Sequence, residues 1–158
     1  MIAASVAGIS AAVVTKAGAA TPDASNTELE AVRKLLQAHD KAMTGHDLKG
    51  VMACLAANAA VMGTGPGEMW SGAEELKVAY EHFFMVFDKG EQDFKSNFMH
   101  GDLAGDMGWA MTSGTVTGKK DGKEFAYPLN ISLTVAKKGG EWKIAAMHFS
   151  TLTGKEKA

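Results

Sequence analysis

The sequence predicts an α+β fold in a single domain, with three helices in its first half and an antiparallel sheet in its second half. The chain has 158 residues, of which 46% are hydrophobic and 22% charged, and this is enough for one core. Apolar residues recur at helical spacing as far as about residue 90, whereas strict alternation and tight turns dominate afterwards. Helices and strands that are segregated along the chain are typical of α+β domains.

The first helix is expected to begin close to residue 27. Ser25 and Glu28 stand three residues apart, as in a capping box at the start of a helix. One face of this helix carries Leu29, Val32, Leu36, His39 and Met43. Gly45 is expected to end it.

Two further helices and a short strand are predicted before the sheet. Asp47 can cap a short helix whose apolar positions are Leu48, Val51, Met52 and Leu55. Residues 59–62 suit a short strand, and the Gly-rich segment 63–67 suits a loop. Ser71 and Glu74 form a second capping box. The apolar stripe of the third helix comprises Leu76, Tyr80, Phe83, Phe84 and Phe87.

The second half of the chain predicts a meander of four antiparallel strands. Strand character is found in segments 93–100, 109–117, 125–135 and 142–150. The third segment alternates apolar and more polar residues without interruption, as a half-buried strand does. Asp121 and Gly122 predict a two-residue type I′ turn, because both tolerate positive φ. Gly139-Gly140 predicts a second tight turn.

An uncharged segment opens the chain. Residues 2–14 carry no charge and small residues fill 17–20, as in the apolar region and cleavage site of a secretory signal peptide. We therefore expect a signal peptide at 1–20, a linker at 21–26, the folded domain at 27–152 and a solvated tail at 153–158. The expected location is periplasmic or secreted. The basic n-region is missing, so a misplaced start codon and a flexible Ala-rich tail stay open as alternatives.

Composition excludes several classes of function. Sixteen basic and eighteen acidic residues give a net charge of -2 and no basic patch suited to nucleic acid. The single cysteine, Cys54, rules out an internal disulfide and a cysteine-based zinc site. No apolar segment reaches the roughly 18 to 20 residues that a membrane span needs, so no membrane anchor is expected.

The order of these elements resembles the nuclear transport factor 2-like superfamily, and within it the SnoaL-like and ketosteroid isomerase-like domains. The resemblance covers about residues 27–152 and is carried by segments 42–51 (AMTGHDLKGV), 70–76 (WSGAEEL) and 140–150 (GEWKIAAMHFS). It implies a cystatin-like cone, in which three helices pack on a strongly curved, mainly antiparallel sheet around a mostly apolar pocket. It also implies a homodimer that forms through the sheet.

The resemblance places the catalytic positions of ketosteroid isomerases on this chain. The oxyanion-binding tyrosine falls at His39, the second oxyanion donor at Asn130 and the general-base aspartate at Gly63. His39 and Asn130 can still donate hydrogen bonds, although the strand face of Asn130 suits a pocket wall and a dimer interface equally. Glycine cannot abstract a proton, so the sequence argues against steroid isomerisation by the family mechanism.

His148 and His39 are the candidate catalytic residues. On the last strand, one face is expected to carry Trp142, Ile144, Ala146, His148 and Ser150. If this face lines the pocket, apolar walls would keep His148 neutral and basic. The alternative is structural: His148 and Ser150 form hydrogen bonds near the end of the sheet, and His39 is a buried core histidine.

Two functions stay open. The first is the binding of an apolar small molecule without catalysis, in a pocket lined by Trp70, Tyr80, Phe83, Phe84, Phe87, Asn130 and Ser150. The second is a lyase, cyclase or isomerase that uses His148 and His39 as acid and base on a carbonyl-bearing substrate. Gly63 at the base position favours binding without catalysis, whereas His148 and His39 leave an enzymatic function open. A second copy of the chain is the expected protein partner, and no cofactor is expected.

A metal site is not expected either. The chain has ten methionines and five histidines, and the pairs Met99-His100 and Met147-His148 contain the soft ligands that copper(I) prefers. Neighbouring residues on a strand point to opposite faces, so neither pair can bind one ion. Methionine as an adaptable filler of a core or pocket is the simpler interpretation.

Overall fold

A computed structural model describes residues 22–151, with side chains from Asn26 onward. The helices of this part are α1 (Pro22–Thr44), α2 (Leu48–Cys54) and α3 (Gly72–Val86). The strands are β1 (Leu55–Met62), β2 (Met69–Ser71), β3 (Asp93–Ala104), β4 (Met107–Lys120), β5 (Lys123–Lys138) and β6 (Glu141–Ser150). The predicted signal peptide at 1–20 and the whole predicted tail at 153–158 lie outside the described residues, and residues 22–26, expected to be linker, are helical.

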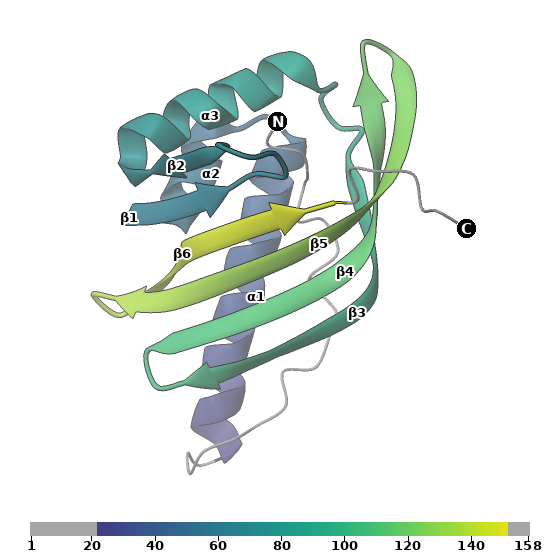
Figure 1. Cartoon of the computed structure of the whole chain (residues 1–158). Helices are drawn as coiled ribbons and strands as arrows, with labels where there is room; N and C mark the ends of the chain where they lie inside the picture. The colour runs from purple at the N-terminus through teal and green to yellow at the C-terminus, as the bar shows by residue number, and fades with distance from the viewer. Residues whose placement is uncertain (1–21, 152–158) are drawn as a thin grey trace.

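The strands form one six-stranded sheet in the order β2-β1-β6-β5-β4-β3 (Figure 1). The predicted meander is confirmed, because β3 to β6 pair antiparallel in sequence order. The sheet is nevertheless mixed, since β1 lies parallel to β6 and carries β2 at the edge. The α+β class with three helices on a curved sheet, predicted from the sequence, is thus confirmed.

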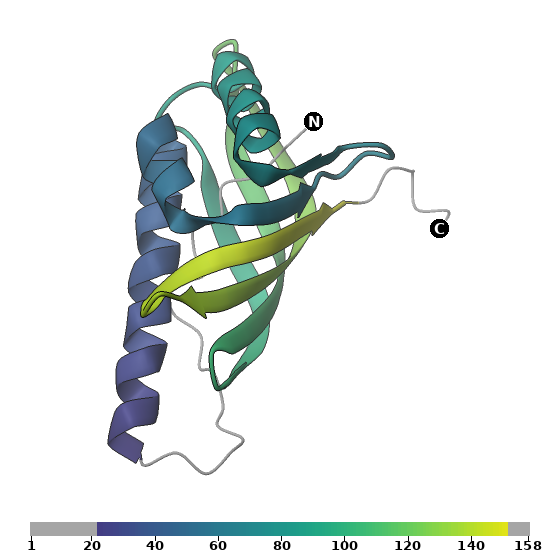
Figure 2. The same ribbon diagram turned by 90° about the vertical axis from the view of Figure 1, so that its left-hand side faces the viewer.

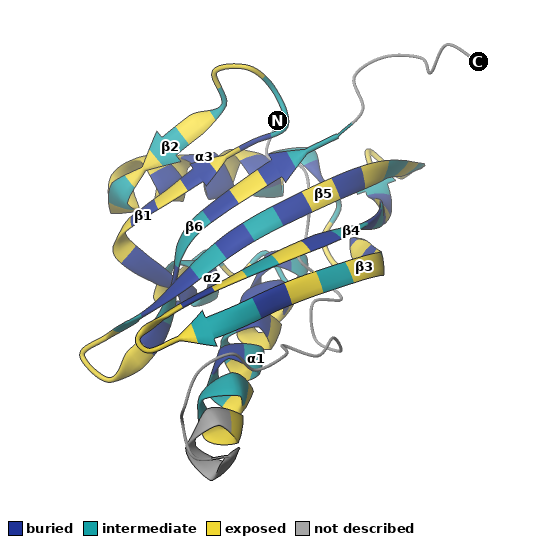
Figure 3. Ribbon diagram, turned by 60° about the horizontal axis from the view of Figure 1, so that its bottom comes forward, coloured by how far each residue is buried: buried dark blue, intermediate teal, exposed yellow. Residues whose placement is uncertain are grey.

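One face of the sheet carries the helices. Helix α1 runs across this face, and α3 lies beyond it over β1 and β2 (Figures 1 and 2). The strands alternate between buried and exposed residues, as the banding in Figure 3 shows. On β5, Leu129, Ile131, Leu133 and Val135 are buried as the alternation predicted, and Ala136 at the end of this run is buried as well. In the described part of the chain no helix covers the opposite face, which we call the outer face.

A β-bulge changes the predicted pattern of β6. The pairing of β5 with β6 shifts in register between Thr134 and Val135, so that Ala145 is left out of the ladder. Trp142 and Ile144 face the helices, but after the bulge it is Met147 and Phe149 that are buried. The prediction that residues 142 to 150 keep one alternation is therefore wrong. His148 and Ser150 fall on the outer face.

The side chain of Glu28 links α1 to the sheet through hydrogen bonds and does not cap the helix. Its carboxylate accepts hydrogen bonds from Lys137 Nζ at 2.7 Å and from Trp142 Nε1 at 2.6 Å. These two bonds explain why the pKa of Glu28 is lowered. The helix begins at Pro22, upstream of the capping box predicted at Ser25 and Glu28, and the prediction of this box is therefore wrong.

None of the described helices is both long and apolar enough to cross a membrane.

The tip of the β4–β5 hairpin is held against the end of α3. Asp121 and Gly122 form the predicted turn with φ of 52° and 73°. The carboxylate of Asp88, just after α3, accepts hydrogen bonds from the backbone N–H of Asp121 at 3.1 Å and of Gly122 at 2.7 Å. The backbone N–H of Asp88 in turn donates to the carbonyl of Lys119. The long hairpin curves toward the end of α3, where this contact holds its tip (Figure 1).

Candidate functional site

A hollow lies along α3, beside β2 and the loop that precedes it. Its volume is about 270 Å³, and its wall consists of Glu68, Trp70, Val78, Ala79, His82, Phe83, Val86 and Phe87. Most of these side chains are apolar, and Ala79, Phe83 and Phe87 are buried. Concave apolar surfaces with a few polar groups are the usual form of small-molecule sites. This hollow is therefore the candidate site.

A larger hollow of about 550 Å³ lies beside the β4–β5 hairpin. Its lining residues include Glu91, Thr117, Glu124 and Ala126, all of them exposed. An ion pair of 3.0 Å between Lys119 and Glu91 crosses it. It is an open surface depression in which charged side chains are prominent, and Phe125 is the aromatic residue of its wall. A small-molecule site is usually lined mostly by apolar residues.

Stacked aromatic rings build the inner wall of the α3 hollow. The rings of Phe83 and Phe87 stack with centroids 4.6 Å apart, and Phe87 meets Phe125 of β5 edge to face at 5.5 Å. Phe125 stacks in turn on Tyr127 at 5.6 Å. Phe83 and Phe87 belong to the α3 side of this row, and Phe125 and Tyr127 belong to β5. The hydrogen bond between Asp88, the residue after Phe87, and Gly122 of the β4–β5 hairpin ties these two sides together. The row of rings thus runs from Phe83 and Phe87, which line the hollow, to Phe125 and Tyr127 on β5, which do not line it.

The loop between β1 and β2 brings a carboxylate to the hollow. The backbone N–H of Gly63 donates to the carbonyl of Glu68 at 2.8 Å and closes the loop. The N–H of Gly65 donates to the Glu68 carboxylate at 2.9 Å, which folds this side chain back over the loop. A Cβ added at Gly63 would collide with that carboxylate. Glu68 therefore fills the space that a side chain at position 63 would occupy.

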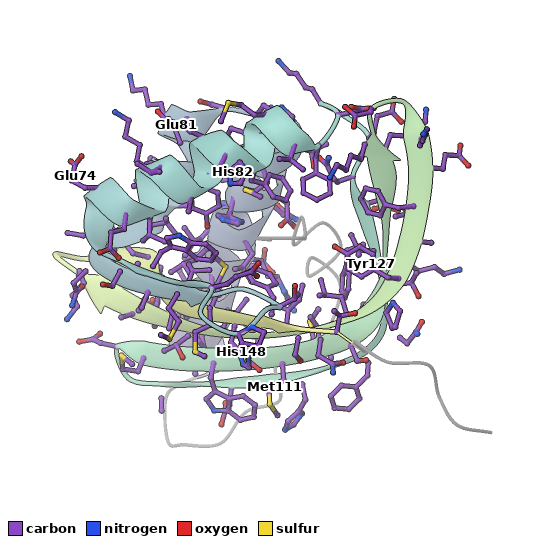
Figure 4. The ribbon with its side chains drawn as sticks, turned by 45° about the horizontal axis from the view of Figure 1, so that its top comes forward. Glu74, Glu81, His82, Met111, Tyr127 and His148 are labelled. Atoms are coloured by element: carbon purple, nitrogen blue, oxygen red, sulfur yellow. The ribbon has the colours of Figure 1, made fainter. Side chains whose placement is uncertain are left out.

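His82 is the second ionisable residue of the hollow. It is an exposed residue on α3, one turn before Val86 (Figure 4). Sequence analysis did not single out Glu68 or His82. A helical wheel of α3 could have found His82, because it follows Val78 by four residues on the same face. Only the closed loop reveals the position of Glu68.

Tyr127 carries a buried hydroxyl in the same aromatic row. It lies on the curved part of β5, on the side of the sheet that α3 occupies (Figure 4). Among the described residues its hydroxyl has no hydrogen-bond partner. Burial raises the pKa of the tyrosine to about 12, so the hydroxyl stays protonated and can donate a hydrogen bond.

His39 lies in the core and does not line the hollow. It is 1% exposed, and neither ring nitrogen has a hydrogen-bond partner among the described residues. Its ring lies edge-on to Tyr80 at 6.3 Å, and its Nδ1 is 4.0 Å from a carboxylate oxygen of Asp40. Burial lowers the pKa of His39 to about 4. His39 is a neutral histidine at physiological pH.

The structure does not bring His148 and His39 together. His148 is exposed on the outer face of the sheet (Figure 4). His39 of α1 is buried in the core on the side of the helices. Asn130 and Ser150 are paired neighbours on β5 and β6, and they also lie on the outer face. The sheet thus separates His148 from His39, which were expected to act as acid and base. Asn130 and Ser150 face away from the hollow.

The aromatic residues predicted to bind a ligand are divided between hollow and core. Trp70, Phe83 and Phe87 line the hollow. Tyr80 is 1% exposed in the core, and burial raises its pKa above the ordinary value. Phe84 stacks on His46 at 4.6 Å. A role of any of these residues in binding stays a prediction.

A family comparison identifies the domain. The family model for the SnoaL-like domain matches residues 32–154, which is most of the chain. The chain belongs to the SnoaL-like family. No match was found among curated proteins.

Solved structures share the fold of this SnoaL-like domain. A nuclear transport factor 2-like protein of unknown function from Pseudomonas putida KT2440 is 17% identical, with a TM-score of 0.71 over 84% of this chain and 92% of that one. A candidate dehydratase of the same family from Streptomyces avermitilis is 15% identical, with a TM-score of 0.71 over 82% and 99%. A ketosteroid isomerase-like protein from Erwinia carotovora atroseptica is 22% identical, with a TM-score of 0.64 over 82% and 99%. The family and the cone-shaped fold predicted from the sequence are confirmed.

The SnoaL-like domain has few groups suited to a metal or a nucleophile near the hollow. Among the described residues, no three or more His, Cys, Asp or Glu side chains gather as metal ligands would. Cys54 is buried, and burial raises the pKa of its thiol, which keeps it in the unreactive thiol form. The chemistry of the hollow therefore depends on Glu68 and His82.

Proposed function

We propose that this SnoaL-like domain binds a small, mostly apolar molecule in the hollow along α3. The observation that carries the proposal is a hollow of about 270 Å³ with stacked phenylalanines inside and two ionisable groups beside them. This volume is close to the lower end of the roughly 300 to 1,000 Å³ range of ligand sites. A molecule of one or two rings fits such a space.

The polar groups of the hollow define what else the ligand carries. Glu68 accepts hydrogen bonds, and His82 both donates and accepts them. A ring bearing a hydroxyl or carbonyl group would stack on Phe83 and Phe87 and place its oxygen toward these two residues. Such a ligand agrees with the small apolar or carbonyl-bearing molecule expected from the sequence.

Binding is tested with a matched pair of variants on α3. Val78 is 64% exposed at the hollow, so Val78→Trp can block the space without disturbing the core. Met85 is 78% exposed and does not line the hollow, so Met85→Trp is the control. The probe is 8-anilinonaphthalene-1-sulfonate, followed by its fluorescence, and native mass spectrometry reports molecules that co-purify. We expect Val78→Trp to weaken probe binding about tenfold and Met85→Trp to leave it unchanged. Equal binding by both variants would exclude this hollow.

A second candidate function is acid–base catalysis in the same hollow. The position of the Glu68 carboxylate over Gly63 favours it, because the family resemblance places the general base at position 63. The expected lyase, cyclase or isomerase would then use Glu68 in place of the pair His148 and His39. The candidate dehydratase from Streptomyces avermitilis shares the fold. Cyclic ketones in heavy water test this: exchange of the protons next to the carbonyl, followed by NMR, should be lost in Glu68→Gln.

We also propose a homodimer through the outer face and export from the cytoplasm. Large hydrophobic side chains are exposed on this face of β3 and β4, among them Phe98, Met107 and Trp109. Apolar patches of this kind are typical of protein interfaces.

The proposed export is tested by sequencing the N-terminus of the mature protein from its host, where an intact Met1 would contradict it.

A further inference from the structure

The hollow along α3 is built by one continuous segment of the chain. All eight residues of its wall lie in segment 68–87, which comprises the end of the Gly-rich loop, β2, α3 and the residue after it. The chemistry of this single segment therefore decides which molecules the hollow attracts.

The excess negative charge of the protein lies in the same segment. Segment 68–87 contains four glutamates and one lysine, whereas the rest of the chain has fourteen acidic and fifteen basic residues. Glu68 lines the hollow and is half-buried. Glu74, Glu75 and Glu81 are exposed on α3, where Figure 4 labels the first and the last of them. The electrostatic potential at the hollow thus favours a positively charged molecule over a neutral one.

Three aromatic side chains line the hollow together with the Glu68 carboxylate. Trp70 belongs to β2, Phe83 to α3, and Phe87 follows the last residue of α3. The π-electrons of an aromatic ring attract a cation at the face of the ring, and tryptophan does so most strongly. Sets of aromatic rings bind quaternary ammonium groups in this way. The wall therefore combines two independent sources of attraction for a cation.

We propose that the hollow binds an organic ammonium ion, that is, a small apolar molecule that carries a positively charged, alkylated nitrogen. This proposal rests on the proposed function and specifies the chemical class of its ligand. A molecule that covers the hollow displaces water from the carboxylate of Glu68, which is unfavourable unless the molecule brings a charge or a donor. An ammonium group brings the charge, and its alkyl groups contact Trp70 and the two phenylalanines.

An inorganic cation does not fit this wall. The wall supplies one carboxylate and one imidazole, and nowhere in the described part of the chain do three or more His, Cys, Asp or Glu side chains gather as metal ligands would. Metal ions require several such ligands in a defined geometry. Val78, Ala79 and Val86 offer apolar contact area instead, which suits the hydrocarbon part of an organic cation.

The test compares benzyltrimethylammonium with neopentylbenzene, which has the same shape but a carbon atom in place of the charged nitrogen. The chain has three tryptophans, and ¹⁵N labelling of the full chain reports each indole N–H by NMR. We expect benzyltrimethylammonium to shift the indole signal of Trp70. The signals of Trp109 on the outer face and of Trp142, which donates to Glu28, should stay in place. The cation should bind about tenfold more tightly than its carbon isostere.

Two variants that each remove one negative charge locate the origin of this preference. Glu68→Gln keeps the size of the side chain and an oxygen that can accept the hydrogen bond from Gly65. It should reduce the preference for the cation about fivefold. Glu81→Gln removes an exposed charge from the same segment but not from the wall, so the preference should change by at most about twofold. Circular dichroism of both variants checks that the fold is retained.

The outcomes separate this inference from the function on which it rests. If both ligands shift the Trp70 signal and bind equally tightly, the hollow is a binding site and the ammonium proposal is overturned. A preference that is the same in the parent, Glu68→Gln and Glu81→Gln would overturn it as well. If neither ligand shifts the Trp70 signal although Val78→Trp weakens binding of the fluorescent probe, the ammonium proposal alone fails. If Val78→Trp and Met85→Trp also bind that probe equally, both proposals fail.

Discussion

The carboxylate of Glu68 occupies the space that a side chain at Gly63 would fill. Two hydrogen bonds donated by backbone N–H groups fix this relationship, one from Gly63 to the Glu68 carbonyl and one from Gly65 to the Glu68 carboxylate. The loop before β2 thus places the Glu68 carboxylate beside Gly63, in the space where any other residue at position 63 would have its side chain. The hollow along α3 therefore has an acidic group, Glu68, although the position-by-position comparison with ketosteroid isomerases places a glycine, Gly63, at the base position.

Gly63→Ala should destabilise the domain by about 1 to 3 kcal/mol, because the new methyl group overpacks against Glu68. Urea denaturation of Gly63→Ala, Glu68→Ala and the double variant measures the coupling between the two positions. We expect the double variant to lose less free energy of unfolding than the sum of the single variants. Strictly additive losses would show that the two residues do not compete for one space.

His39 should make the domain sensitive to mild acid. Its pKa is lowered from 6.5 to about 4 in the folded protein, so the unfolded chain binds the proton more tightly. The stabilisation is complete above pH 6.5 and is lost as the pH falls from 6.5 to about 4, to a total of about 3 kcal/mol. Urea denaturation at intervals from pH 7.5 to 4 measures it. His39→Leu should flatten the curve in this window, and an unchanged slope would assign the acid sensitivity to other groups.

Glu28→Gln should lower the denaturant midpoint at pH 7, since the bonds to Lys137 and Trp142 lose their charged acceptor. The folded-state pKa of Glu28 lies below its ordinary value of 4.5, so its stabilisation is present above pH 4.5 and is lost as the pH falls through the folded-state pKa. The difference between parent and variant should therefore shrink in acid. Glu30→Gln, on the same helix and paired with Arg33, is the control. A constant difference from pH 7 to 3 would contradict this role.

Trp109→Glu should convert the proposed homodimer into a monomer. Trp109 is 42% exposed on the outer face, and its ring meets His100 edge to face at 5.4 Å. A charge in an apolar interface is strongly unfavourable, because it is buried without a partner. Light scattering after size exclusion measures the mass of the parent, of Trp109→Glu and of the control Met85→Glu on α3. A parent protein that is already monomeric would refute the dimer.

Much of the fold could be predicted because its signals are local. The stripe that includes Val32, Leu36 and Met43 is buried as helical spacing indicated, and the alternation of β5 is correct. The Asp121-Gly122 turn follows from the positive φ that these two residues tolerate. Local hydrogen bonding and burial periodicity were sufficient for these elements.

The candidate site could be predicted only in part. Phe83 and Phe87 follow from the apolar stripe of the third helix and lie at the hollow together with Trp70. The predicted position of His148 depended on an unbroken β6. A single bulge reverses the direction of every later side chain, since residues along a strand alternate between two faces. No local pattern in the sequence marks Ala145 as the bulged residue.

By itself the sequence determined the class of the fold, the order of its elements and the family, because these depend on periodicity and on turn residues a few positions apart. The tertiary structure decided which face His148 occupies, which carboxylate reaches Gly63 and which residue of β1 is paired with His148. These relationships join residues through sheet register and loop closure. They depend on long-range pairing, which residue spacing along the chain does not record.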